Sequence, residues 1–174
     1  MSRDGQGADM PTQEEVAQQP LEQRLGRMSR TADDLAVAIR SRAEAVLTRR
    51  PDGKNWAANE VICHLRDIEE VYFLRSHAIL INDDPKLYAD PSAADRFAED
   101  RQYLRNDAGQ ALAAFRRRRE ESLALLRSLT PEQLQRGCLH PTRGRVTIDA
   151  FVTMLAWHDD NHLDQLRRAL EGKA

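Results

Sequence analysis

The chain has 174 residues, with 26 lysines and arginines, 28 aspartates and glutamates, and 41% hydrophobic residues. This length and composition fit one globular domain with a substantial core and exclude a wholly disordered chain. The net charge of -2 gives no overall basic field for nucleic acid, and no apolar run approaches the roughly 18 residues of a membrane span. We therefore expect neither nucleic acid nor a membrane as a partner.

The N-terminal segment, residues 1–20, is polar and contains two glycines and two prolines. We predict a flexible tail there. It holds no apolar stretch of the kind that a secretory signal needs, so we expect a cytoplasmic protein. Cys63 and Cys138 lie far apart and are too few for a disulfide scaffold, so both are expected to be reduced.

A first long helix is predicted to begin at Leu21. Apolar residues recur from there at steps of three and four as far as Val46, which is typical of one buried helical stripe. Pro51 and Gly53 end the pattern. A second helix is predicted from about residue 56 to residue 81, before a break at residues 82–85.

Residues 86–107 show no sustained period, which indicates a long crossover connection between helices 2 and 3. We expect one short helix in it, at about residues 97–104. The third helix is predicted over about residues 108–129, and its apolar stripe includes Arg119.

Thr130 is predicted to cap a short helix that has a proline in its first turn. A loop is expected over residues 137–145, and Thr147 is predicted to cap the last helix, which runs to about Gly172. Four amphipathic helices must bury their stripes against one another. The sequence therefore predicts an all-α, up-down four-helix bundle over residues 21–174.

Two positions on the apolar stripe of the last helix are histidines, His158 and His162. Their four-residue spacing places both rings on one face, where they can converge on a single ion. The glutamate of the HExxH metalloprotease motif is missing. His64 faces inward from the second helix and offers a third imidazole, which would leave a coordination position open for water or substrate. A pair of histidines that merely lines a polar stripe is the alternative.

Three further residues are candidates for supporting roles. Arg119 at a core position either pairs with an acidic side chain such as Glu69 or Glu70, or presents a cation to an anionic substrate. Asp159 either supports one of the histidine rings or is simply exposed. His140, in the loop before the last helix, is either a substrate contact or a turn residue.

Two segments, residues 53–75 and 140–166, resemble the DinB/YfiT-like family. The first has a tryptophan at the helix start followed by an inward His-Leu pair. The second has an HPxxG loop and an H-x-x-x-H-x-x-Q ending that closes with Gln165, and the third helix carries an F-x-x-x-R pattern at Phe115 and Arg119. Ala57 and Asn161 depart from the family pattern without removing a ligand.

The resemblance implies a four-helix bundle that forms a homodimer and holds a divalent metal ion, zinc or nickel, on His64, His158 and His162. It implies a supporting or substrate-contacting position for Gln165, and a small-molecule substrate. The chemistry expected from it is thiol S-transfer, with a low-molecular-weight thiol such as bacillithiol or mycothiol as cosubstrate, or hydrolysis. A metal-binding or stress-response bundle without turnover, and a purely structural dimer, are the alternatives. No catalytic acid or base is assigned.

Overall fold

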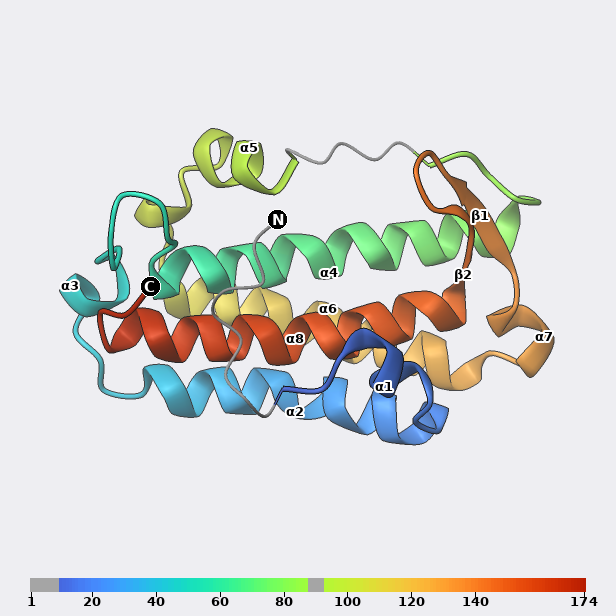
Figure 1. Cartoon of the computed structure of the whole chain (residues 1–174), viewed down its shortest axis with the longest axis horizontal. Coiled ribbons are helices and arrows are strands. Elements are labelled where there is room, and N and C mark those ends of the chain that lie inside the picture. The colour runs from blue at the N-terminus through green and yellow to red at the C-terminus, as the bar shows by residue number, and fades with distance from the viewer. Residues whose placement is uncertain (1–9, 88–92) are drawn as a thin grey trace.

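Four long helices form a bundle in the computed structural model, which describes residues 10–87 and 93–174 (Figure 1). These helices are α2 (Leu21–Ile39), α4 (Ala58–Ile81), α6 (Ala108–Ser128) and α8 (Ile148–Leu170). Both α2 and α4 pack against α6 and α8, so that α2 and α4 lie on one diagonal of the bundle. The predicted all-α four-helix bundle is confirmed.

The connection between α4 and α6 returns the chain to the end of the bundle where α4 began (Figure 1). Helices α4 and α6 therefore run in one direction, and α2 and α8 run in the opposite one. The predicted long crossover is confirmed. It contains α5 (Ala93–Asp100) and the 3-10 turn η1 (Tyr103–Arg105), two separate elements where the sequence predicted a single short helix.

The last part of the crossover is anchored to α4 by buried polar side chains. The Asn59 amide donates to the backbone oxygens of Tyr103 and Asn106, at 2.9 and 2.7 Å. One turn beyond His64, the Asp67 carboxylate accepts a 2.6 Å bond from the hydroxyl of Tyr103. These contacts hold the helix on both sides of His64.

The Asp67 contacts predict a pH-dependent contribution to stability. Burial raises the pKa of this carboxyl, but hydrogen bonds led by those from Arg66 and Tyr103 outweigh burial and bring the pKa below its usual range. Such a group stabilises the fold above the carboxyl's unfolded pKa of about 4, and the contribution is lost as the pH falls through the folded pKa. We expect Asp67→Asn to lower the free energy of unfolding by about 1–3 kcal/mol near neutral pH.

The difference between wild type and Asp67→Asn should shrink as the pH falls below about 4. Urea unfolding of both proteins across that range measures it. A loss that is equally large at neutral and acidic pH would contradict the role of the ionised carboxylate.

The first predicted helix is broken near its end, so the prediction of one helix reaching Val46 is wrong. Helix α2 ends at Ile39, and a separate short helix, α3 (Glu44–Leu47), follows it. Between them Ser41 has a φ of 59°, which a continuous helix cannot contain. Val46 is half-buried. The apolar spacing therefore continues through the break and conceals it.

The N-terminal segment packs against the bundle earlier than predicted. Helix α1 (Gln13–Ala17) contacts α8 and buries Val16. Thr12 and Glu15 form a capping box at its start, a pattern that is visible in the sequence. The predicted tail thus does not extend to residue 20, and residues 1–9 lie outside the described part.

The predicted loop before the last helix is a β-hairpin. Strands β1 (Gly137–His140) and β2 (Gly144–Thr147) pair antiparallel, and Leu139 exchanges backbone hydrogen bonds with the segment that follows α4. Four-residue strands are too short to show a clear alternation in the sequence. The hairpin closes the end of the bundle where α4 finishes (Figure 1).

Both predicted caps after α6 are confirmed. The Thr130 side chain begins α7 (Pro131–Leu134) with a capping box, and the Thr147 side chain accepts a bond from the backbone N–H of Ala150 at the start of α8. Among the helices of the described residues, none has the length and apolarity to cross a membrane.

Candidate metal centre

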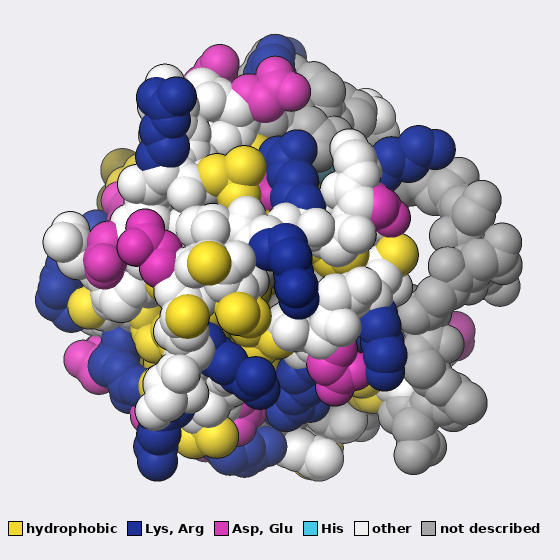
Figure 2. Space-filling view, turned by 90° about the vertical axis from the view of Figure 1, so that its left-hand side faces the viewer, with side chains coloured by type: hydrophobic (Ala, Val, Ile, Leu, Met, Phe, Trp, Pro, Cys, Tyr) yellow, Lys and Arg dark blue, Asp and Glu magenta, His cyan; other side chains and the backbone are white. Residues whose placement is uncertain are grey.

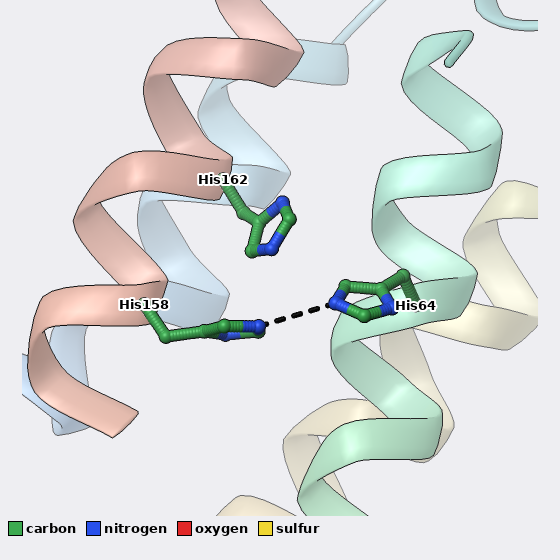
Figure 3. Close-up of side chains that lie close together, drawn as sticks. All are labelled: His64, His158 and His162. Atoms are coloured by element: carbon green, nitrogen blue, oxygen red, sulfur yellow. Dashed lines mark hydrogen bonds between the residues drawn. The ribbon is translucent and has the colours of Figure 1, made fainter. Parts of the chain in front are cut away.

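Three histidines meet across the seam between α4 and α8 (Figure 3). His64 extends from α4, and His158 and His162 extend from α8, one turn apart. The Nε2 atoms of His64 and His158 are 3.1 Å apart, and one ring nitrogen from each of the three lies within 4.8 Å of the others. The structure thus brings together the three imidazoles that the helical stripes singled out.

Burial keeps all three rings neutral. It lowers the pKa of His64 to about 3, with a further contribution from the nearby His162 ring. Burial also lowers the pKa of His158, which the other two rings lower further, and burial lowers the pKa of His162. Neutral imidazole is the form that binds a metal ion, because its unprotonated nitrogen has a free lone pair.

The donor set fits a divalent ion such as zinc or nickel. Imidazole nitrogens bind these ions well, and a Zn–N distance of about 2.0–2.1 Å places two ligand atoms on one ion roughly 3–3.5 Å apart. The 3.1 Å between His64 and His158 lies in that range. The widest separation in the group, 4.8 Å, is larger, so one ring must turn towards the other two. Three protein ligands leave a position open, as catalytic sites do.

Gln165 orients one of the rings. Nδ1 of His162 lies 2.7 Å from the side-chain oxygen of Gln165 and donates to it, which leaves Nε2 unprotonated. In contrast, Nδ1 of His158 is buried without a hydrogen-bond partner among the described residues. The structure therefore places Gln165 in direct contact with the His162 ring.

This contact predicts an effect on metal affinity. Gln165→Leu removes the acceptor and lets the His162 ring change tautomer, so we expect metal to bind about tenfold more weakly. Gln165→Glu keeps an acceptor oxygen at the same position and is the matched control. Competition with a chromophoric chelator measures both variants. An affinity for Gln165→Leu within twofold of wild type would contradict the orienting role.

Trp56 covers part of the site, a role that sequence reasoning missed. Its ring lies 4.9 Å from the His64 ring and stacks on His162 at 6.4 Å and 17°. The side chain is half-buried and lies against two of the three rings. The available signal was a tryptophan placed directly before the helix that carries His64.

Arg119 and Asp159 are paired inside the core, next to the histidines. The Arg119 guanidinium donates to both oxygens of Asp159 and to Glu69. The first of the two interpretations of Arg119, an ion pair with Glu69, is confirmed, whereas Glu70 pairs with Arg118. Asp159 is fully buried, so the second of its two interpretations, a simply exposed side chain, is wrong.

His140 lies away from the three histidines, so of its two interpretations the substrate contact does not hold for this site and the turn residue is confirmed. It ends strand β1, which packs beyond the far end of α4. The helix between His64 and Ile81 is about 25 Å long at a rise of 1.5 Å per residue. His140 Nδ1 instead accepts a bond from the backbone N–H of Thr142, which is a turn contact.

Cys63 does not contribute a nucleophile or a ligand. Its sulfur lies 3.9 Å from the backbone oxygen of Tyr103, on the crossover side of α4. Burial raises its pKa to about 11, which keeps it a thiol at neutral pH. Cys63 and Cys138 are both free and buried.

Comparisons with known proteins identify relatives along most of the chain. A family model described as the DinB superfamily matches residues 27–166. YfiT of Bacillus subtilis is 27% identical over 109 residues, which cover 62% of this chain and 60% of YfiT. OB0413 of Oceanobacillus iheyensis is 20% identical over 165 residues, covering 92% of this chain and 91% of its own length. BH0277 of Halalkalibacterium halodurans is 27% identical over 129 residues, which cover 73% of this chain and 72% of BH0277.

All three relatives are named as candidate metal-dependent hydrolases. Among solved structures, YfiT from Bacillus subtilis superimposes with a TM-score of 0.80 at 19% identity, over 98% of this chain and 95% of YfiT. That structure is described as a four-helix bundle of unusual topology. At this identity the likeness concerns the fold, which is the same.

Proposed function

This chain belongs to the DinB superfamily, and from that membership and the convergence of its three histidines we propose that it is a divalent-metal-dependent hydrolase. His64, His158 and His162 would hold the ion. The observation that carries the proposal is that three neutral imidazoles from two helices each bring a ring nitrogen within 4.8 Å of the others. Three such ligands would leave a position open for water or substrate. The names of the relatives support hydrolysis as the reaction class.

A divalent ion on three imidazoles lowers the pKa of a coordinated water to near neutrality and polarises a substrate carbonyl or phosphoryl oxygen. The chain's own residues would prepare the site for that chemistry. Gln165 keeps Nε2 of His162 unprotonated, and Trp56 restricts the approach of water from one side. The depressed pKa values keep protons from competing for the ligand nitrogens.

The substrate we expect is a small anionic molecule. Lysine and arginine side chains are spread over the end of the bundle where α4 begins, with acidic side chains between them (Figure 2). Exposed cations there include Arg40, Arg42, Arg49 and Lys54. A surface of this kind raises the local concentration of anions and speeds their encounter with the site. Raising the ionic strength should therefore increase KM more than it lowers kcat.

The decisive experiment combines metal analysis with turnover. Untagged protein is analysed for zinc, nickel and other divalent metals, and then assayed against carboxylic esters, amides and phosphoesters. We expect about one ion per chain, together with a hydrolysis that a chelator removes and the same ion restores. Hydrolysis that survives complete removal of the metal would overturn the proposal.

Thiol transfer is tested in the same assay. Bacillithiol or mycothiol is added with an electrophile, and consumption of both is followed. Turnover that requires the thiol, without hydrolysis of any ester, amide or phosphoester, would replace the hydrolase by an S-transferase on the same three ligands. Bound metal without either activity would leave a metal-binding bundle.

A further inference from the structure

A layer of charged side chains divides the hydrophobic core into two clusters. One cluster, around Leu35, Ile62 and Phe115, fills the end where α4 begins, and the other, around Met28 and Phe151, fills the opposite end. Between them lie the following buried polar residues: Thr31, Glu69, Arg119 and Asp159. We call this set the charged layer.

Hydrogen bonds within the charged layer join all four long helices. Arg119 of α6 donates from Nε to Glu69 of α4 at 2.9 Å, and from Nη2 to Asp159 of α8 at 3.1 Å. Its Nη1 donates to the backbone oxygen of Met28 on α2 at 2.9 Å. Thr31, also on α2, donates to Asp159 at 2.6 Å.

The charged layer lies at the level of the metal centre. Asp159 directly follows His158 and precedes His162 by three residues, and Glu69 follows His64 by five. Neighbouring residues of a helix point about 100° apart, so holding Asp159 towards α2 and α6 turns His158 towards the seam with α4. In the same way, holding Glu69 towards α6 fixes the direction of His64 on α4.

Small rotations of these helices would separate the ring nitrogens. A side-chain atom at the edge of a helix lies roughly 6 Å from the helix axis, so a rotation of about 20° displaces it by about 2 Å. Metal–ligand distances tolerate only about 0.2 Å. A bond network that prevents this rotation therefore determines whether His64 and His158 can share an ion.

The layer also has one cation and two carboxylate side chains. Burial lowers the pKa of Arg119, but Asp159 and Glu69 outweigh burial and raise it, so the guanidinium stays charged. One Glu69 oxygen is buried without a hydrogen-bond partner among the described residues.

We propose that Arg119 and Asp159 are positioning residues for the three-histidine centre, holding α4 and α8 in the rotation at which the imidazoles meet. This inference rests on the proposed metal-dependent function. It concerns binding of the ion, which can be measured without knowing the substrate.

The test compares Arg119→Met with Arg24→Met in the full chain. Arg24 is also buried and donates to an α8 carboxylate, that of Asp149, at 2.8 Å. Asp149 precedes His158 by nine residues, or about 13 Å along the helix. Arg24→Met therefore removes an ion pair between α2 and α8, one whose carboxylate is partly exposed, without touching the charged layer.

We expect Arg119→Met to weaken Co²⁺ binding by about tenfold to a hundredfold, and to shift the visible absorption bands that report the geometry around Co²⁺. Arg24→Met should change the affinity less than twofold and leave the bands in place. Equal changes in the two variants would overturn the proposal. Thr31→Val removes the bond from Thr31 to Asp159, and its control Thr153→Val removes the bond from Arg24 to Thr153; neither leaves a charge unpaired. Thr31→Val should weaken Co²⁺ binding more than Thr153→Val does.

A second measurement keeps the inference separate from the proposed function. Nitrogen NMR of the metal-free protein reports the hydrogen bond between Nε2 of His64 and Nε2 of His158. We expect this bond in wild type and Arg24→Met, and its loss in Arg119→Met. If wild type binds no Co²⁺, the metal proposal fails. If the bond persists in Arg119→Met, the positioning role fails whether or not metal binds.

Discussion

His158→Ala should abolish stable metal binding and reduce metal-dependent turnover to background. Removing a group that merely orients a ligand weakens metal binding about 10–100-fold, so removing a ligand should weaken it by more than about a hundredfold. Two imidazoles would remain, and His64 would lose the partner that lies 3.1 Å from its Nε2. Elemental analysis after dialysis, followed by titration with Zn²⁺, measures the loss. His64→Ala and His162→Ala should behave in the same way.

The matched control is His77→Ala. His77 lies on α4, as His64 does, but it is exposed, and its Nδ1 interacts with the backbone oxygen of Phe73. Metal content and activity should both stay at the wild-type level in this variant. The melting temperature of metal-free His158→Ala separates ligand loss from unfolding. Near-stoichiometric metal in folded His158→Ala would refute the assignment of this residue as a ligand.

The three histidines could be found from the sequence because the signal is local. A four-residue step on one apolar stripe places His158 and His162 on one face, and the inward face of the second helix places His64 towards the core. Gln165 was singled out by the resemblance to the family, and its three-residue distance from His162 allows the contact that the structure shows. Local periodicity thus predicted most of the site and all four long helices.

The helical stripe placed Arg119 in the core and offered Glu69 as its partner, but the place of Asp159 in the charged layer could not be predicted in the same way. Asp159 is flanked by Asp160 and is polar, so its sequence position alone favours exposure. It is buried because Arg119, 40 residues earlier in the chain, and Thr31, 128 residues earlier, lie opposite it in the folded bundle. No helical period contains that information, because it depends on which faces of α2, α6 and α8 meet.

The remaining errors concern short elements: the break between α2 and α3, and the hairpin before α8. The apolar spacing continues from α2 into α3, although Ser41 breaks the helix between them. The hairpin at residues 137–147 is stabilised by pairing between its two strands and with the segment after α4, and not by a pattern within either strand. The interpretation of His140 as a turn residue nevertheless holds, because its ring accepts a bond from the backbone N–H of Thr142.

Arg119→Met should cost about 3–5 kcal/mol of unfolding free energy in the metal-free protein, because it leaves Glu69 and Asp159 as buried carboxylates without their cation. In a chain of this length, 1 kcal/mol corresponds to about 2–4 °C, so the melting temperature should fall by about 10 °C. Differential scanning calorimetry with a chelator present measures this change. A loss below about 1 kcal/mol would show that the carboxylates find other partners or become protonated without strain.

Replacing the whole layer should have a different effect from breaking it. In the triple variant Glu69→Leu, Arg119→Met, Asp159→Leu, no buried charge is left unpaired, and the two core clusters can join through apolar contacts. Replacing a buried ion network by apolar residues of similar volume is often neutral or stabilising by about 1–4 kcal/mol. The triple variant should therefore melt well above Arg119→Met, yet bind Co²⁺ no better than it does. Stability recovered without metal affinity would mean that the charged layer is retained for the geometry of the histidines, whereas recovery of both would mean that any well-packed core can align them.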